Sequence, residues 1–236
     1  MAKGIIFDFG GTLDTGGNHW GKVMWHAWER QGIPVSEEQF REAYIYAERT
    51  LGRNPIILPT YTFKKMLDMK LRLQLEYMFT KKYWMTDKQE YAKLVLAMLT
   101  DLYEMVQRNI TESRQVLLRL KEKYQLALVT NFYGNMPVVL QEFCLDGIFQ
   151  QVTESAVAGV RKPDERLLRM GVDALGGNPA ELIVVGDSIP NDIIPAKRMG
   201  CRTVWLKGEG WDDASAGDLQ PDLIVESINE LEKCLL

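Results

Sequence analysis

Two acidic motifs that lie far apart in the chain combine residue types suited to metal-assisted chemistry. Asp8 lies within the apolar run at residues 4 to 9, which ends at the glycine pair Gly10-Gly11. Asp187 and Asp192 lie in the segment GDSIPND, directly after a second apolar run. Because side chains at the carboxyl ends of neighbouring parallel strands meet in one crevice, these three carboxylates are predicted to share a site. Their oxygens would suit a hard cation such as Mg²⁺.

Two further segments carry groups suited to holding an anion. The run LALVTN ends in Thr130 and Asn131, whose hydroxyl and amide could hold phosphate oxygens. Lys162 lies in GVRKPDE just before Pro163, which we expect to be the first residue of a helix. A fixed cation there would neutralise a transferring anion. Each segment alone is also typical of ordinary turns and helix starts, so the evidence lies in the combination.

The elements that must position these groups alternate in the second half of the chain. Besides the first strand near residues 4 to 9, the apolar runs predict strands at 125–130, 150–153, 182–187, 202–206 and 222–225. Helices are predicted at 112–123, 135–143, 164–175, 190–199 and 227–235. This alternation predicts βαβ units and a parallel sheet, with the first strand at its centre.

Residues 20 to 108 have the periodicity of helices instead. An apolar stripe beginning at Trp20 repeats at helical spacing. Two segments, Ser36 to Gln39 and Thr86 to Gln89, have the form of capping boxes, and two long helices are predicted at 61–83 and 86–108. We therefore predict an α/β core made of residues 1–15 and 109–236, with an inserted all-helical domain at residues 16–108.

The bulk composition excludes several classes of function. The chain has 236 residues, of which 46% are hydrophobic, so it can bury a sizeable core. Its net charge of −4 and its lack of a basic block disfavour nucleic acid and anionic lipid as partners. No apolar run approaches twenty residues, and the three cysteines have no zinc-ligand spacing. We expect a cytoplasmic protein that does not span a membrane and that acts on a small molecule.

In their order and at these strand ends, the four segments resemble the motifs of the haloacid dehalogenase-like hydrolase superfamily, over residues 8 to 192. The resemblance implies a Rossmann-like parallel-sheet core with a helical cap of the C1 type, which closes over the site. It implies that Asp8 is a nucleophile that forms a phospho-aspartyl intermediate, while Thr130 and Lys162 hold the phosphoryl group. The implied ligands of Mg²⁺ are three carboxylates and one backbone carbonyl: Asp8, Asp187, Asp192 and Gly10. The implied activity is Mg²⁺-dependent hydrolysis of a small phosphorylated metabolite.

Gly10 departs from the pattern of the superfamily, whose phosphatases usually carry a second Asp at this position. That Asp protonates the leaving group and then activates water, help that is typically worth about 10²- to 10⁴-fold in rate. The interpretation that we favour is a phosphohydrolase acting on a good leaving group, such as an acyl phosphate or a sugar 1-phosphate. Asp14 lies near the same loop and could stand in, although a solvated turn residue is its more ordinary interpretation.

Glycine at position 10 is also compatible with two different kinds of protein. A 2-haloacid dehalogenase also lacks the second Asp, but that branch usually lacks the acidic metal pair, represented here by Asp187 and Asp192. A non-catalytic member could keep the pocket to bind a phosphate ligand. The related phosphonate hydrolases use a cap lysine to form a Schiff base. The absence of lysine between Lys22 and Lys64 disfavours that chemistry.

Overall fold

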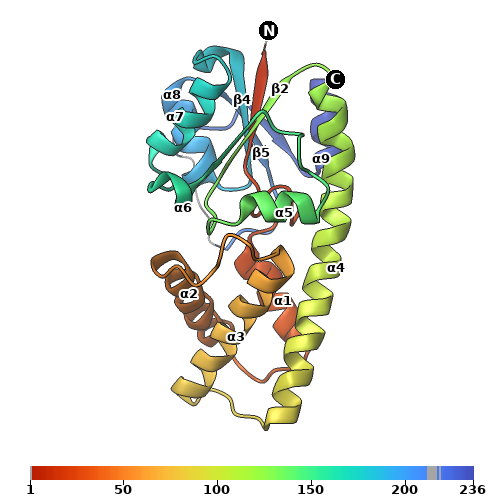
Figure 1. The fold of residues 1–236 in the computed structure, drawn as a ribbon, viewed down its shortest axis with the longest axis vertical. Helices are drawn as coiled ribbons and strands as arrows, with labels where there is room; N and C mark the ends of the chain where they lie inside the picture. Colours follow the sequence, from red (N-terminus) through yellow and green to blue (C-terminus); the bar gives the residue numbers. More distant parts are fainter. Residues whose placement is uncertain (1, 212–216, 218) are drawn as a thin grey trace.

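A six-stranded parallel sheet forms the centre of the protein (Figure 1). The computed structural model describes residues 2–211, 217 and 219–236. In the order in which they lie across the sheet, the strands are β3 (Gln151–Glu154), β2 (Gln125–Thr130), β1 (Gly4–Phe7), β4 (Leu182–Gly186), β5 (Arg202–Leu206) and β6 (Leu223–Val225). The α-helices are α1 (Trp20–Arg30), α2 (Glu37–Arg53), α3 (Phe63–Lys81), α4 (Lys88–Lys121), α5 (Met136–Glu142), α6 (Ser155–Ala158), α7 (Glu165–Ala174), α8 (Ile194–Met199) and α9 (Ile228–Leu235). The predicted α/β fold with a parallel sheet is confirmed.

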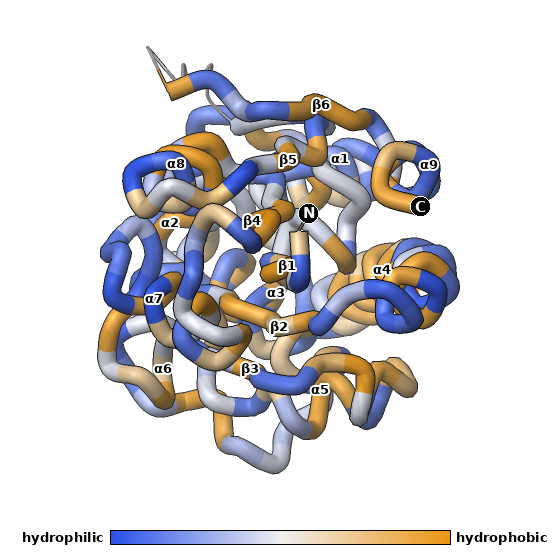
Figure 2. The backbone as a smooth tube through the Cα atoms, turned by 90° about the horizontal axis from the view of Figure 1, so that it is seen from above, coloured by the Kyte–Doolittle hydropathy of each residue, from blue (hydrophilic) through white to orange (hydrophobic). Residues whose placement is uncertain are grey.

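Helices cover both faces of this sheet. Viewed along the strands, α7 and α8 lie on one side, and α4 and α9 lie on the other (Figure 2). Successive side chains of β1 alternate between these layers, since Ile6 packs in the cluster of α7 and α8, whereas Ile5 and Phe7 pack in the larger cluster that includes α4. All four residues of β1 are buried, which explains the continuous apolar run in the sequence.

An all-helical insertion separates β1 from β2, as predicted. It consists of α1, α2, α3 and the N-terminal half of α4, which lie beyond one end of the sheet (Figure 1). We call this group the cap. Its interior is apolar and aromatic, and Trp28 and Phe40 are fully buried with their rings 5.4 Å apart. No helix of the described residues has the length and apolarity that a membrane span requires.

The helix α4 corrects one prediction of the sequence analysis. Two helices were expected, at 86–108 and 112–123, but α4 is one helix of 34 residues. At the expected gap, the Thr111 hydroxyl donates to the carbonyl of Gln107 within the helix, so this residue does not end it. Buried side chains continue on both sides of the gap, at Ile110 and Ser113. Consequently, no break in secondary structure marks the domain boundary that we predicted between residues 108 and 109.

Three helix starts show which capping patterns were interpreted correctly. The capping box from Ser36 to Gln39 is present at the start of α2. The box proposed at Thr86 is wrong, because Asp87 is the N-cap of α4 and its carboxylate accepts from two backbone N–H groups. Pro163 is not the first residue of a helix, since α7 begins at Glu165 with Asp164 as its cap. A carboxylate directly before the helix satisfied the backbone donors in both of these cases.

Candidate active site

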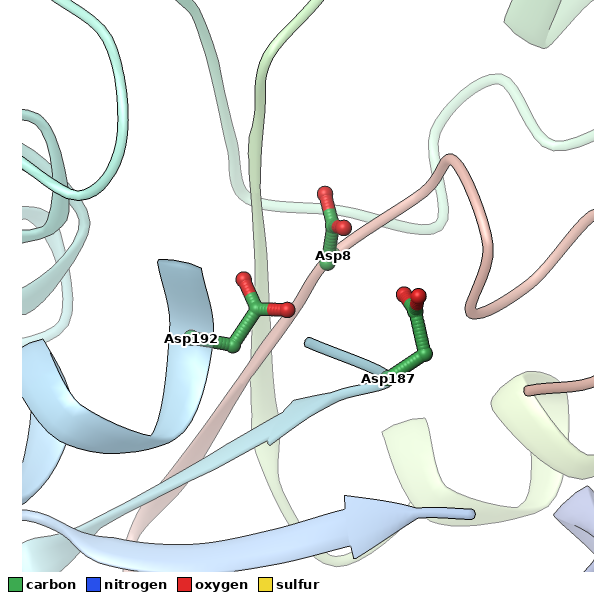
Figure 3. Close-up of side chains that lie close together, drawn as sticks. All are labelled: Asp8, Asp187 and Asp192. Carbon is green, nitrogen blue, oxygen red and sulfur yellow. The ribbon is translucent and has the colours of Figure 1, made fainter. Parts of the chain in front are cut away.

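Three carboxylates meet at the carboxyl ends of β1 and β4, which are neighbours in the sheet. Asp8 follows β1, Asp187 follows β4, and Asp192 lies in the π-helical turn Ile189–Ile193 (Figure 3). One oxygen from each carboxylate lies within 4.8 Å of the others. The structure therefore brings together the three acids that the sequence analysis selected. Two buried acids and one partly exposed acid form the cluster.

Lys162 is the cation of this acidic cluster. Its Nζ lies 2.8 Å from Asp8 Oδ1 and 2.6 Å from Asp192 Oδ1. Burial opposes its positive charge, but the adjacent carboxylates of Asp192 and Asp8 more than offset this effect and raise the pKa of Lys162. The lysine is therefore fully protonated at neutral pH. Were all three carboxylates ionised, the one ammonium would leave two negative charges unbalanced.

These unbalanced charges perturb the acids themselves. Burial, followed by the nearby charges of Asp192 and Asp8, raises the pKa of Asp187 well above its usual value. Burial also raises the pKa of Asp192, to about 6, although Lys162 opposes the shift. Carboxylates crowded at this distance disfavour one another's ionisation unless a further cation is present. Additional positive charge beside these carboxylates would favour their ionised forms.

The loop after β1 holds Asp187 in place through one hydroxyl group, that of Thr12. Thr12 Oγ1 donates to Asp187 Oδ1 at 2.8 Å and accepts from the Asp187 backbone N–H at 3.0 Å. Gly11 has a φ of +96°, and a Cβ there would lie only 2.4 Å from Asp187 Oδ2. Glycine is therefore required at this position for both conformation and space.

The two residues that end β2 have different environments. Thr130 is buried, and its hydroxyl has no hydrogen-bond partner among the described residues. The phosphate contact that we expected from this hydroxyl stays a prediction. Asn131 instead clamps the lysine: its amide donates to the Lys162 carbonyl at 3.1 Å, and its oxygen accepts from the Lys162 backbone N–H at 2.8 Å. Asn131 thus positions Lys162, and the phosphate contact that we expected from its side chain stays a prediction.

A cavity of about 170 Å³ lies between the strand ends and the cap. Asp8, Lys162 and Asp187 line it on the core side, together with Asn131 and Gly10. The cap contributes polar, aromatic and aliphatic side chains from three helices: Trp20, Tyr44, Glu48, Phe63, Met66, Leu67 and Lys70. The cavity therefore belongs jointly to the core and the cap.

The indole ring of Trp20 lies beside the position of the missing second Asp. A Cβ on Gly10 would lie 4.0 Å from Trp20 Nε1, which donates to Asp14 Oδ2 at 2.9 Å. The other oxygen of Asp14 accepts from the Gly11 backbone N–H at 2.7 Å. Asp14 is completely buried, so its interpretation as a solvated turn residue is wrong. Burial raises its pKa to about 7, against the opposing effect of these two hydrogen bonds.

The sequence analysis did not select Lys70 or Glu48. Lys70 is buried on α3, where it interrupts an apolar stripe that runs from Phe63 to Met78. A lysine at a core position of a helix is rarely buried without a partner, so this break in the pattern was a usable signal. Its partner Glu48 lies on α2, and nothing in the spacing of these residues pairs them.

Comparison with known proteins decides the family. The sequence profile of the haloacid dehalogenase-like hydrolases matches residues 2–200, which is most of the chain. The chain belongs to this family. It is accordingly a hydrolase, and the resemblance drawn from the four motifs is confirmed.

Similar proteins of assigned activity are phosphatases. A glyceraldehyde 3-phosphate phosphatase of Pyrococcus furiosus is 37% identical over 105 residues, which cover 42% of this chain and 42% of that protein. The chain thus matches less than half the length of this relative. A phosphoglycolate phosphatase of Vibrio vulnificus is 29% identical over 234 residues, covering 97% of this chain and 94% of that protein.

Solved structures share the fold over the full chain. A crystal structure of a dehalogenase with an intermediate complex has a TM-score of 0.63 at 18% identity, covering 99% of this chain and 97% of its own. A phosphatase of the same family from Thermococcus onnurineus has a TM-score of 0.51 at 20% identity, with the same coverage. At these identities the likeness establishes the common fold of core and cap.

Proposed function

We propose that this protein is a Mg²⁺-dependent phosphohydrolase that acts on a small metabolite through an aspartyl-phosphate intermediate. The observation that carries the proposal is the position of Asp8 at the base of a cavity, paired with Lys162 and beside two further acids. A nucleophilic carboxylate needs a neighbouring cation to receive an anionic phosphoryl group, and Lys162 supplies one.

The acidic cluster fits a divalent cation. Asp8, Asp187 and Asp192 offer hard oxygen ligands within 4.8 Å of one another, and their two unbalanced negative charges equal the charge of one Mg²⁺. The Gly10 carbonyl is the fourth ligand that we propose. When bound, the cation would supply positive charge that stabilises the charge developing on the phosphoryl oxygens.

The residues of the chain divide the reaction into two displacements. A carboxylate oxygen of Asp8 attacks phosphorus, and the bond to the leaving oxygen breaks with its electron pair. Water then attacks the same phosphorus, releases inorganic phosphate and returns the Asp8 carboxylate. Lys162 stays protonated in both steps and neutralises the phosphoryl oxygens, while the Thr130 hydroxyl donates to one of them.

Gly10 decides which leaving groups are turned over quickly. Gly10 places no acid beside the leaving oxygen, and both oxygens of buried Asp14 already accept hydrogen bonds. Asp14 lines the cavity, but its carboxyl is held by these two hydrogen bonds, so we infer that it does not replace the missing acid at position 10. Substrates whose leaving group departs with less need for a proton, such as acyl phosphates and sugar 1-phosphates, are therefore favoured.

The second candidate is a 2-haloacid dehalogenase, and the absence of an acid at Gly10 is the observation that favours it. Halide departs without protonation, so such a reaction would not need the missing Asp. Asp187 and Asp192 argue for phosphate instead, because their negative charges serve no evident purpose in a reaction on a haloacid.

The decisive experiment measures Mg²⁺-dependent phosphate release from acetyl phosphate, with p-nitrophenyl phosphate and an alkyl phosphate for comparison. The control is Asp8→Asn, which preserves the size of the side chain and removes the nucleophile. We expect turnover that requires Asp8 and is fastest with acetyl phosphate. Turnover by Asp8→Asn near that of the parent would remove Asp8 from the nucleophilic role. No release from any compound, with chloride release from 2-chloropropionate, would establish the dehalogenase.

A further inference from the structure

A buried ion pair forms part of the wall of the cavity on the cap side. Lys70 Nζ, on α3, lies 2.6 Å from Glu48 Oε1, on α2. The side chain of Lys70 is 8% exposed, and that of Glu48 is 30% exposed. Tyr133, which follows β2 in the core, donates its hydroxyl to Glu48 Oε2 at 2.7 Å. All three residues line the cavity that contains Asp8.

This cluster has unused hydrogen-bonding capacity. A lysine ammonium carries three donors, and Glu48 is the single acceptor within ion-pair distance of Lys70 among the described residues. Its other close neighbours are aromatic faces, with Nζ 5.8 Å from the centre of the Trp20 ring and 5.3 Å from that of Tyr133. Each oxygen of Glu48 has one partner, Lys70 at Oε1 and Tyr133 at Oε2, and a carboxylate oxygen can accept more than one hydrogen bond. Unused donors of Lys70 therefore lie beside a carboxylate that can accept a further hydrogen bond.

Both members of the pair are charged. Burial disfavours ionisation of Glu48, but Lys70 more than offsets it and lowers the pKa of Glu48. The same pairing raises the pKa of Lys70 against the effect of burial. A Schiff-base lysine needs a lowered pKa, so the cap lysine of this cavity is unsuited to that reaction. Lys70 lies on the cap outside the stretch between Lys22 and Lys64 that contains no lysine, and its pairing with Glu48 also disfavours Schiff-base chemistry.

The charges in the cluster select for a neutral ligand that both donates and accepts. A carboxylate on the ligand would be attracted by Lys70 but repelled by Glu48. An ammonium group would be attracted by Glu48 but repelled by Lys70. A hydroxyl group can accept from Lys70 and donate to Glu48 at the same time. The rings of Trp20, Tyr44 and Phe63 line the same cavity and offer apolar surface for a short carbon skeleton.

We propose that Lys70, Glu48 and Tyr133 form a hydroxyl-binding subsite that holds the polyol or sugar part of a small phosphorylated substrate. This inference rests on the proposed phosphohydrolase function and names its substrate class. It joins two independent features of the cavity, because a sugar 1-phosphate carries both the hydroxyl groups that fit this cluster and a leaving group that tolerates Gly10.

The test compares inhibitors of acetyl phosphate hydrolysis that differ only at the end remote from phosphate. Glycerol 3-phosphate and propyl phosphate have the same three-carbon length, and glycerol 3-phosphate carries two additional hydroxyl groups. We expect glycerol 3-phosphate to bind about tenfold or more tightly, as is typical of hydrogen bonds to charged groups. Phosphoglycolate and 2-aminoethyl phosphate probe the carboxylate and ammonium alternatives, and tighter binding of either would overturn the proposal.

Three variants connect the effect to the cluster. Lys70→Met and the double variant Glu48→Gln/Lys70→Met should abolish the preference for glycerol 3-phosphate over propyl phosphate. The double variant leaves no unpaired buried charge, so it is the safer test where the single change impairs folding. Lys65→Met makes the same change at an exposed position of α3 and should keep the preference.

Two results would separate this proposal from its rivals. If the Lys70 variants weaken the binding of both inhibitors equally, the cluster of Lys70, Glu48 and Tyr133 merely links the cap to the core, and the subsite proposal is overturned. If the parent protein does not hydrolyse acetyl phosphate, the proposed function fails. Titration calorimetry of both inhibitors with the Mg²⁺-loaded protein then still tests the subsite, since it measures binding without turnover.

Discussion

Gly10→Asp is the substitution that most directly tests how the leaving group departs. The φ angle of Gly10 lies outside the left-handed region, and the nearest atoms to a new Cβ would belong to the Trp20 indole, at 4.0 Å. This is an ordinary van der Waals distance, so a Cβ fits at this position without displacing the loop. The neighbouring Gly11 shows the contrast, because a Cβ there would lie 2.4 Å from the Asp187 carboxylate.

The expected gain depends on the leaving group. A positioned general acid typically contributes about 10²- to 10⁴-fold when the departing oxygen needs a proton. For an alkyl phosphate we expect kcat/KM to rise about 10²-fold, the lower end of that range, because the indole beside residue 10 limits how the new carboxyl can turn. Acetate departs without a proton, so acetyl phosphate should gain less than about threefold if the acid contributes nothing to its departure. The variant should therefore flatten the dependence of rate on leaving group.

The assay is kcat/KM for Mg²⁺-dependent phosphate release from acetyl phosphate, p-nitrophenyl phosphate and propyl phosphate. Gly10→Asn is the matched control, since it has the same size but no acidic proton. A gain with Asp that is absent with Asn would establish acid catalysis at position 10. If Gly10→Asp stays folded, still hydrolyses acetyl phosphate and gains nothing on propyl phosphate, then the reasoning from the missing acid is refuted.

Three further predictions follow from the charges of the site. Lys162→Met removes the ammonium between Asp8 and Asp192, and should lower kcat/KM for acetyl phosphate by about 10²-fold or more; a loss below threefold would contradict its proposed role. The pKa of Asp14 is raised from 3.8 to about 7 in the folded state, so between these pH values the folded protein keeps this proton while the unfolded chain loses it. The free energy of unfolding should thus fall, by up to about 4 kcal/mol, as the pH rises from about 4 to 7, and urea titrations of Asp14→Asn should show a smaller fall; an identical pH profile would be inconsistent with the buried acid. Mg²⁺ should raise Tm more at pH 8 than at pH 5 relative to EDTA, because burial raises the pKa of Asp192 to about 6 and protons compete with the cation below it; equal shifts at both pH values would argue against binding at these carboxylates.

The sheet could be predicted from the sequence because its signals are local. Buried parallel strands need short apolar runs between helical segments, and the strands β2 and β5 occupy the predicted residues. The meeting of Asp8 and Asp187 followed from the same reasoning, since the carboxyl ends of adjacent parallel strands must lie at one edge of the sheet.

The helix boundaries were predicted less well where tertiary packing decides them. The polar segment around Thr111 resembled a break, yet buried Ile110 and Ser113 anchor α4 on both sides of it. Packing against the cap at one end and against the sheet at the other makes one long helix more favourable than two short ones.

The sequence by itself determined the family, the parallel sheet and the acids at its edge, because these depend on short motifs and on the geometry shared by all parallel sheets. Only the tertiary structure showed that Asp14 is buried behind Trp20, and that Lys70 pairs with Glu48 across two helices. Burial and pairing arise from contacts between residues far apart in the chain, whose distances no spacing encodes. The proposed substrate subsite therefore depends on the packing of the cap on the core, whereas the acidic cluster depends on the order of the strands.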